Sequence, residues 1–192
     1  MSQKTPLAPA RPDFTRAIET DRLRLRMFQH EDLNDLTALL ADADVMRYVE
    51  DGQPKDRAVA EKALNSIIAH WQRHGFGRWV VEEKPSGAFV GFGGLRSLLG
   101  TPEVVYHLAK TQWGKGFATE LGRAILRYGF DVHRFARIVA IAKPDNAASI
   151  HVMEKIGMHF EMRTSYYDID VVQYAITPEE FEGTAKASES KA

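Results

Sequence analysis

Residues 112–121 read QWGKGFATEL and place two glycines and a lysine directly before an amphipathic segment. From Phe117 to about Phe130 the apolar residues recur at helical spacing, so this segment predicts a helix. The helix dipole disfavours Lys115 at this end, yet unpaired N–H groups at a helix start bind anions, and glycine lets the backbone approach one closely. The loop therefore indicates either a local anion site or a tight turn with a solvated lysine.

Two common phosphate-binding motifs do not account for this loop. A P-loop needs four residues between its first glycine and a Gly-Lys pair, followed by Ser or Thr, and that pattern is absent. The dinucleotide fingerprint needs a third Gly or Ala where this chain has Thr119. Taken alone, the loop predicts an anion and no particular ligand.

The segments around the loop predict one α/β domain. Strand patterns occupy residues 22–26, 79–81, 88–92 and 103–108 before the loop, and 137–142, 160–168 and 171–177 after its helix. Helical spacing marks 31–41 and about 57–74, and Asn146 is a good N-cap for a short helix that ends at Gly157. The order strand, helix, strand from 103 to 142 predicts a parallel pair.

Turns and chain ends complete this outline. Residues 84–87 predict a hairpin turn, and Gly91, Gly93 and Gly94 predict a bulge or a close backbone approach. We expect the domain to span residues 18–182, with a disordered leader at 1–17 that has no signal-peptide h-region and a disordered tail at 183–192.

Composition excludes several classes of function. The 192 residues hold 25 Lys plus Arg against 26 Asp plus Glu, so no general basic field attracts nucleic acid. The chain has no cysteine, which excludes disulfides, thiolate metal sites and a cysteine nucleophile. Its longest apolar run, 87–95, is far shorter than the roughly 18 to 20 residues of a membrane-spanning helix. We therefore expect a cytoplasmic protein without nucleic-acid or membrane partners.

A second motif lies about thirty residues after the loop, where Asn146-Ala147-Ala148-Ser149 precedes the glutamate, lysine and glycine of residues 153–158. Together with residues 113–120 it resembles the paired signature of the GNAT superfamily of N-acetyltransferases, in particular its RimJ/RimL-like branch of ribosomal-protein N-terminal acetyltransferases. Residues 20–26 and 170–176 also resemble the opening and closing strands of that branch, so the resemblance covers about 18–182. It implies a mixed sheet of about six to seven strands with a splayed parallel pair, flanked by about four helices.

The resemblance implies direct transfer of an acetyl group from acetyl-CoA to a primary amine, either a protein N-terminus or a small molecule, without a metal. The backbone of residues 114–118 would bind the pyrophosphate of coenzyme A, residues 108–110 would pair with pantetheine, and the N–H of Leu108 would polarise the thioester carbonyl. It also allows a homodimer. The cofactor-binding residues implied are Leu108, Ala109, Lys110, Trp113, Gly114, Lys115, Gly116, Phe117, Ala118, Asn146 and Ser149. Trp113 stands where the superfamily usually has Gln or Arg.

Two residues of the second motif have both a chemical and a structural interpretation. By resemblance Asn146 would bond the pantetheine arm, and as a helix cap it would bond its own backbone; the two roles are compatible. Many superfamily members protonate the leaving thiolate with a tyrosine seven residues after this asparagine, but that position is Met153. In the ribosomal-type branch the duty falls to the residue that is Ser149 here, which could equally bond its own backbone.

An acceptor amine also needs a base, because an amine with a pKa near about 8 to 10 is protonated at neutral pH. Glu103 is the first candidate, since it matches an acidic strand position of the branch, and an ordinary strand-edge acid is the alternative. His107 lies on the same strand face four residues on and is the second candidate, although packing explains it as well.

Other residues leave alternatives open. His70 and His74 have helical spacing that suits a metal but lack the metalloprotease glutamate, and Trp71, Phe76 and Trp79 suit either an acceptor pocket or the core. The absence of the usual tyrosine favours a second function, a non-catalytic acyl-CoA-binding or regulatory module with the same fold.

Overall fold

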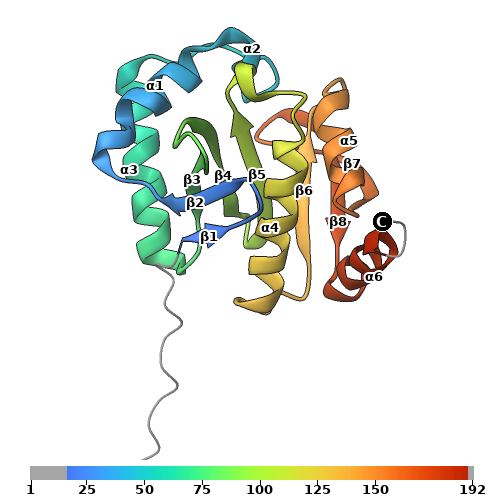
Figure 1. The fold of residues 1–192 in the computed structure, drawn as a ribbon. Coiled ribbons are helices and arrows are strands. Elements are labelled where there is room, and N and C mark those ends of the chain that lie inside the picture. Colours follow the sequence, from blue (N-terminus) through green and yellow to red (C-terminus); the bar gives the residue numbers. More distant parts are fainter. Residues whose placement is uncertain (1–16, 190–192) are drawn as a thin grey trace, which may run out of the picture.

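The computed structural model describes residues 17–189 and contains one eight-stranded sheet in the order β1-β2-β3-β4-β5-β6-β8-β7 (Figure 1). Every neighbouring pair is antiparallel except β5 and β6. The α/β fold class is confirmed, and the sheet has one strand more than expected, the two-residue β1. The strands are β1 Ile18–Glu19, β2 Leu23–Met27, β3 Arg78–Glu83, β4 Phe89–Leu98, β5 Thr101–Leu108, β6 Ile138–Ala142, β7 His159–Tyr166 and β8 Ile169–Ile176.

Six α-helices and two short 3-10 helices connect these strands in the described part of the chain. They are η1 His30–Asp32, α1 Leu33–Ala41, α2 Ala43–Met46, α3 Arg57–His74, η2 Lys110–Gln112, α4 Phe117–Asp131, α5 Ala147–Lys155 and α6 Pro178–Glu189. The sequence predicted α1, α3, α4 and α5, and it missed α2 and α6. The single turn of α2 is too short to show a helical period.

Helix α6 corrects the prediction that residues 183–192 have no structure, because the helix continues to Glu189. Thr177 and Glu180 form a reciprocal cap: the N–H of Thr177 donates to Glu180 Oε2 and the N–H of Glu180 donates to Thr177 Oγ1. The ring of Phe181 packs 5.6 Å from that of Phe130. The capping-box signal was therefore in the sequence. Of the leader expected at 1–17, residues 1–16 lie outside the described residues, as do residues 190–192 of the expected tail.

The parallel pair β5 and β6 is splayed. All eight residues of β5 pair with β4, and β6 pairs with β8 from Ile138 to Ala142, but β5 and β6 share one register pair, Glu103 with Val139. Past that pair each strand follows its antiparallel neighbour, so a gap opens between them on the side of Leu108.

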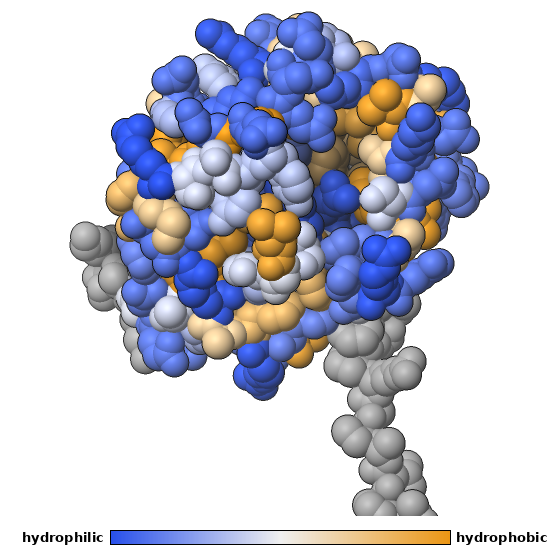
Figure 2. All heavy atoms as spheres, turned by 180° about the vertical axis from the view of Figure 1, so that it is seen from behind, coloured by the Kyte–Doolittle hydropathy of each residue, from blue (hydrophilic) through white to orange (hydrophobic). Residues whose placement is uncertain are grey.

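Helix α4 covers one face of the sheet and lies in front of β5 and β6 in Figure 1. A Cβ on Gly93 would come within 2.8 Å of Leu121 Cδ2, and one on Gly129 within 2.6 Å of Ile138 Cδ1, so glycine is needed for this close packing. A Cβ on Gly91 would lie 2.2 Å from the His107 carbonyl oxygen, which confirms the predicted close backbone approach. Figure 2 shows the opposite face, hollowed near its centre with hydrophilic and hydrophobic side chains inside the hollow.

A single large core holds these layers together. Leu95, Leu121, Ile125 and Ile138 are completely buried between α4 and the sheet. Trp79 is 1% exposed, and its ring centroid lies 5.0 Å from that of Trp71 and 4.8 Å from that of Tyr128. The core interpretation of these tryptophans therefore holds. Within residues 17–189 no helix is both long and apolar enough to cross a bilayer.

Candidate active site

The glycine loop between β5 and α4 has a backbone that requires glycine at two positions. Gly114 has φ 74° and Gly116, the N-cap of α4, has φ 82°, both in the left-handed region. Nothing lies within 4 Å of a Cβ built on Gly114. The side chain of Lys115 reaches back to Gln112 Oε1 at 2.9 Å. The N–H groups of the first α4 turn are thus presented at an open loop, as an anion site requires.

Trp113 fastens this loop to the end of β5. Its indole Nε1 donates to the carbonyl oxygen of Leu108 at 2.8 Å, while the residue as a whole stays 47% exposed. Lys110, between them, pairs with Asp44 Oδ2 on α2 at 2.5 Å. These contacts therefore connect the glycine loop to the end of β5.

The direction of the peptide groups in β5 decides what faces the gap. The N–H of Ala109 donates to Val90 on β4 at 2.9 Å. Because peptide direction alternates along a strand, the N–H groups of Leu108 and Tyr106 point away from β4, toward the gap beside β6. The predicted polarising N–H of Leu108 thus faces the gap, and that of Tyr106 is a second such group that the sequence reasoning did not single out.

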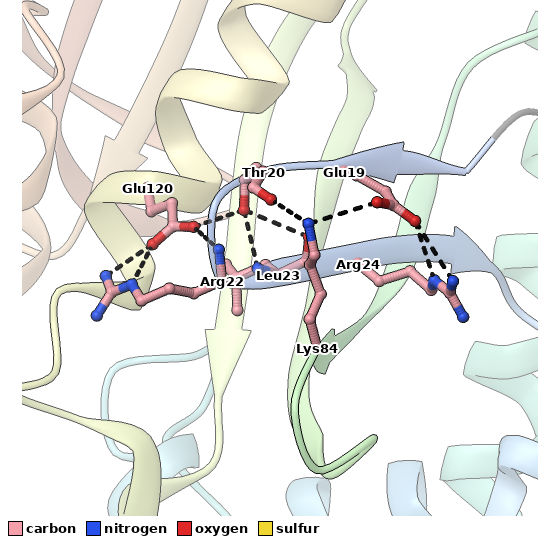
Figure 3. Close-up of polar contacts among 7 residues, drawn as sticks. All are labelled: Glu19, Thr20, Arg22, Leu23, Arg24, Lys84 and Glu120. Carbon is pink, nitrogen blue, oxygen red and sulfur yellow. Dashed lines mark hydrogen bonds and ion pairs between the residues drawn. The ribbon is translucent and has the colours of Figure 1, made fainter.

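Behind the glycine loop lies a network that the sequence reasoning missed (Figure 3). Glu120, in the first turn of α4, accepts hydrogen bonds from Thr20 Oγ1 at 2.5 Å, from the N–H of Arg22 at 2.9 Å and from Arg22 Nε at 2.7 Å. Arg22 Nη1 also donates to the Lys115 carbonyl at 2.8 Å, and its guanidinium lies 4.7 Å from the centre of the Phe117 ring. Arg22 therefore holds the loop and the helix start together.

This network also sets the charge of Glu120 beside the glycine loop. Burial acts to raise the pKa of Glu120, but the hydrogen bonds from Thr20 and Arg22 outweigh it and leave the pKa below its ordinary value. Glu120 is therefore an anion at neutral pH whose charge Arg22 compensates. About a hundred positions of chain separate the partners, so no local pattern reveals the contact.

Helix α5 borders the gap from the other motif. Asn146 Oδ1 accepts the N–H of Ser149 at 3.2 Å, so the predicted helix cap is confirmed. Tyr106 Oη donates to the Ser149 carbonyl at 3.3 Å, which ties β5 to α5. Burial raises the pKa of Tyr106 to about 12, so its hydroxyl keeps its proton. Among the described residues no partner is found for the Ser149 hydroxyl. Met153 is buried in the core.

The structure does not bring Glu103 next to Leu108. The two are five residues apart on an extended strand, about 17 Å at roughly 3.4 Å per residue. Glu103 is 1% exposed and is held by Arg96 through Nε at 2.5 Å and Nη2 at 3.2 Å. Burial raises the pKa of Glu103, and Arg96 and Arg78 oppose that shift.

His107 lies on the sheet face opposite α4. Its ring stacks on Phe92 with centroids 4.7 Å apart, and its Nδ1 is buried with no hydrogen-bond partner in the described structure. Burial, followed by the charges of Arg78 and Arg96, lowers the pKa of His107 to about 4. Its imidazole is therefore neutral at neutral pH.

His70 has a structural role. Its Nδ1 lies 2.8 Å from the Phe76 carbonyl, and its Nε2 accepts the N–H of Ser97 at 3.3 Å. Both ring nitrogens are engaged by backbone groups, which explains the histidine without a metal. Within residues 17–189 no group of three or more metal-ligating side chains occurs.

Comparison with known proteins identifies the family of this chain. The model of the acetyltransferase (GNAT) domain family matches residues 22–159. This chain belongs to the GNAT acetyltransferase family. It is thus an acyltransferase with the mixed sheet and splayed strands that the resemblance implied.

Individual relatives agree with this GNAT assignment. The uncharacterized protein YkkB of Bacillus subtilis is 34% identical over 163 residues, which cover 81% of this chain and 92% of YkkB. The crystal structure of a GNAT-family acetyltransferase from Bacillus anthracis is 27% identical, with a TM-score of 0.75 over 85% of this chain and 99% of that one. A spermidine N-acetyltransferase from Vibrio cholerae, solved in complex with CoA and spermine, shares the fold at 22% identity and a TM-score of 0.71, over 85% of this chain and 99% of that one.

Proposed function

We propose that this GNAT protein transfers an acetyl group from acetyl-CoA directly to a primary amine, in a complex that holds both substrates. The observation that carries the proposal is the gap between β5 and β6, which has N–H groups of Tyr106 and Leu108 on one side and the glycine loop of 114–116 at its end. A chain without cysteine has no thiol to carry the acetyl group, which suits direct transfer.

Coenzyme A would lie along the α4 side of this gap. The backbone of 114–118 would bind the pyrophosphate, and the end of β5 would pair with pantetheine as an added strand would. The N–H of Leu108 would donate to the thioester oxygen as negative charge develops there. The structure of the Vibrio cholerae enzyme with CoA supports a CoA site in this fold. The proposed contacts are those of Leu108, Ala109, Lys110, Trp113, Gly114, Lys115, Gly116, Phe117, Ala118, Asn146 and Ser149.

Attack of the amine nitrogen on the acetyl carbon forms the C–N bond and breaks the C–S bond, so the thiolate must gain a proton. We assign this proton to the Ser149 hydroxyl. The nitrogen carries two protons after the attack and releases one to water, from which Ser149 is protonated again. Tyr106 provides a second hydroxyl beside α5, 3.3 Å from the Ser149 carbonyl, and is the alternative donor.

The proton of the acceptor ammonium must leave before the attack. Glu103 and His107 are the two proposed bases that would take this proton, and we rank His107 first. His107 is four residues nearer to Leu108 along β5 and its imidazole is neutral, whereas the carboxylate of Glu103 is buried and engaged at both oxygens by Arg96. Glu103 would act only through an intervening group such as water.

Two classes of primary amine fit the proposed reaction as acceptors. The motifs of residues 113–120 and 146–157 support a RimJ/RimL-like branch, for which a protein N-terminus is the namesake substrate, and small amines are the other class. The lack of cysteine and of a long apolar run supports a cytoplasmic setting, in which acetyl-CoA is available.

The test of the proposed chemistry is a comparison of two serine variants. Ser149→Ala should lower kcat for release of free CoA by at least about tenfold, because a positioned general acid contributes roughly 100- to 10,000-fold. Ser66→Ala, on the exposed side of α3, is the matched control and should keep full activity. Full turnover in Ser149→Ala together with its loss in Tyr106→Phe would assign the acid to Tyr106 instead.

A non-catalytic acyl-CoA-binding module is the second candidate, and the core position of Met153, in place of the usual tyrosine, favours it. Acetyl-CoA would then bind in calorimetry with ordinary affinity while no amine in a broad panel releases CoA.

A further inference from the structure

A row of charged and polar side chains lies on the sheet face opposite α4, away from the proposed CoA side. It consists of Arg78, Arg96, Glu103 and His107. The strand register aligns Arg78 with Gly94, Arg96 with Glu103 and Phe92 with His107. The Arg96–Glu103 ion pair and the stacking of Phe92 on His107 show that these side chains share one face. The α4 side of the same strands carries Gly93 and Leu95.

This row carries more positive than negative charge. Arg78 and Arg96 contribute two guanidinium groups, and Glu103 contributes one carboxylate, both of whose oxygens bind Arg96. Among residues 17–189 no hydrogen bond or ion pair reaches the Arg78 guanidinium, although Arg78 is largely buried. Burial and the charge of Arg96 lower the pKa of Arg78 to about 10, against the opposing charge of Glu103, so Arg78 remains a cation at neutral pH. Arg78 is thus a partly desolvated cation whose one nearby carboxylate, Glu103, is already bound at both oxygens by Arg96, so a ligand that brings a further negative charge would stabilise it.

The row is also open to a ligand. Arg78, Arg96, Val105 and His107 each keep part of their surface exposed. Figure 2 shows this face hollowed, with hydrophilic and hydrophobic side chains inside the hollow. An amine that enters from here would meet the gap beside Leu108 from the side opposite α4, with His107 next to its path.

We propose that Arg78 binds an anionic group, a carboxylate or a phosphate, carried by the acceptor amine. This inference rests on the proposed acetyl transfer and specifies its acceptor class. A guanidinium matches the planar geometry of either oxyanion, and a partly desolvated site strengthens the contact. Polycationic amines such as the spermine bound by the Vibrio cholerae enzyme would instead be repelled by the net positive charge of Arg78, Arg96 and Glu103.

The test compares acceptors that differ only in the anion. Amino acids are paired with their amides, and phosphoethanolamine with ethanolamine, and kcat/KM is calculated per unit of free amine. The wild-type protein should prefer the anionic member of at least one pair by about tenfold or more, and the pair that responds tells carboxylate from phosphate. Arg78→Gln should reduce this preference to near one, and Arg78→Lys should keep part of it. Arg24→Gln, on the exposed side of β2, should keep all of it.

A binding measurement separates this inference from the proposed function. Calorimetry in the presence of CoA compares each N-acetylated acid with its N-acetylated amide, so it needs no turnover. If no pair is acetylated, the proposed function fails, while tighter binding of the acid that Arg78→Gln abolishes still supports the anion site. The anion site would be overturned if the neutral amides bind as tightly as the acids or more tightly. It would also be overturned if folded Arg78→Gln keeps the preference for the acid.

Discussion

Glu103 shows how a single buried charge is stabilised in this protein. Its side chain is 2% exposed, and Arg96, at 39% exposed, binds both carboxylate oxygens. Two parallel charge-assisted bonds are among the stronger polar contacts in proteins. If one partner is removed, the other is left as an uncompensated charge away from water.

We therefore expect Arg96→Gln to lower the free energy of unfolding by about 2 to 4 kcal/mol, somewhat below the usual range for buried pairs because Arg96 is partly exposed. Urea denaturation followed by circular dichroism measures the change. Arg24→Gln is the control: Arg24 and Glu19 are both about half exposed and 3.3 Å apart, so its loss should stay below about 1 kcal/mol. Similar losses of unfolding free energy in the two variants would show that the Arg96–Glu103 pair stabilises the fold no more than an exposed ion pair does.

Asp32 is a second buried carboxylate, and its contribution to the stability of the fold depends on pH. Burial acts to raise the pKa of Asp32, but Arg26 at 2.7 and 2.9 Å and the N–H of Gln29 at 2.7 Å leave that pKa below its ordinary value of 3.8. A carboxyl with a lowered pKa stabilises the folded state above its ordinary pKa, and the contribution is lost as the pH falls through the folded-state value.

Asp32→Asn should accordingly be less stable than the wild type at pH 7, and the difference should shrink as the pH falls from about 4 to about 2. Free energies of unfolding measured by urea titration at several pH values give the comparison. A difference that stays constant over this range would mean that Asp32 has the same pKa in both states.

At the scale of elements, the turn between β1 and β2 supports the glycine loop. Arg22 reaches both Glu120 and the Lys115 carbonyl, so the loop that would bind pyrophosphate is fixed from behind. Without Arg22, the loop would lose a hydrogen bond and the Glu120 carboxylate would repel the phosphates.

Arg22→Ala should therefore weaken acetyl-CoA binding by about 5- to 50-fold, since one charge-assisted bond and one uncompensated charge are at stake. Isothermal calorimetry measures the affinity, and Arg24→Ala, which faces Glu19 on the neighbouring strand position, should leave it unchanged. The double variant Arg22→Ala with Glu120→Gln should recover part of the loss. An unaltered affinity of Arg22→Ala for acetyl-CoA would show that the turn between β1 and β2 does not support the CoA site.

Local patterns predicted the elements whose signal lies within one stretch of chain. Period-two alternation and glycine turns indicated seven strands, and the helix between 103 and 142 indicated the parallel pair. The contacts that complete the site join distant stretches: Arg22 with Glu120, Tyr106 with Ser149. Such contacts depend on how the sheet packs and twists, which no local spacing encodes. The Arg96–Glu103 pairing likewise follows only from the register set by the turn at Leu99 and Gly100.

At the scale of the whole molecule, the two faces of the sheet carry different groups beside the gap between β5 and β6. The face under α4 and α5 carries the loop and Ser149, and the opposite face carries Arg78, Arg96 and His107. A donor and an acceptor can thus approach the same N–H groups from opposite sides, which is what direct transfer through a ternary complex requires.

The most direct test of this account is mass spectrometry of the acceptor after incubation of the purified protein with acetyl-CoA and a panel of amines, amino acids and peptides. We predict a product heavier by one acetyl group on nitrogen, formed in equal amount to the CoA released and strongly reduced in Ser149→Ala. Tight binding of acetyl-CoA without any acetylated amine across the panel would contradict it.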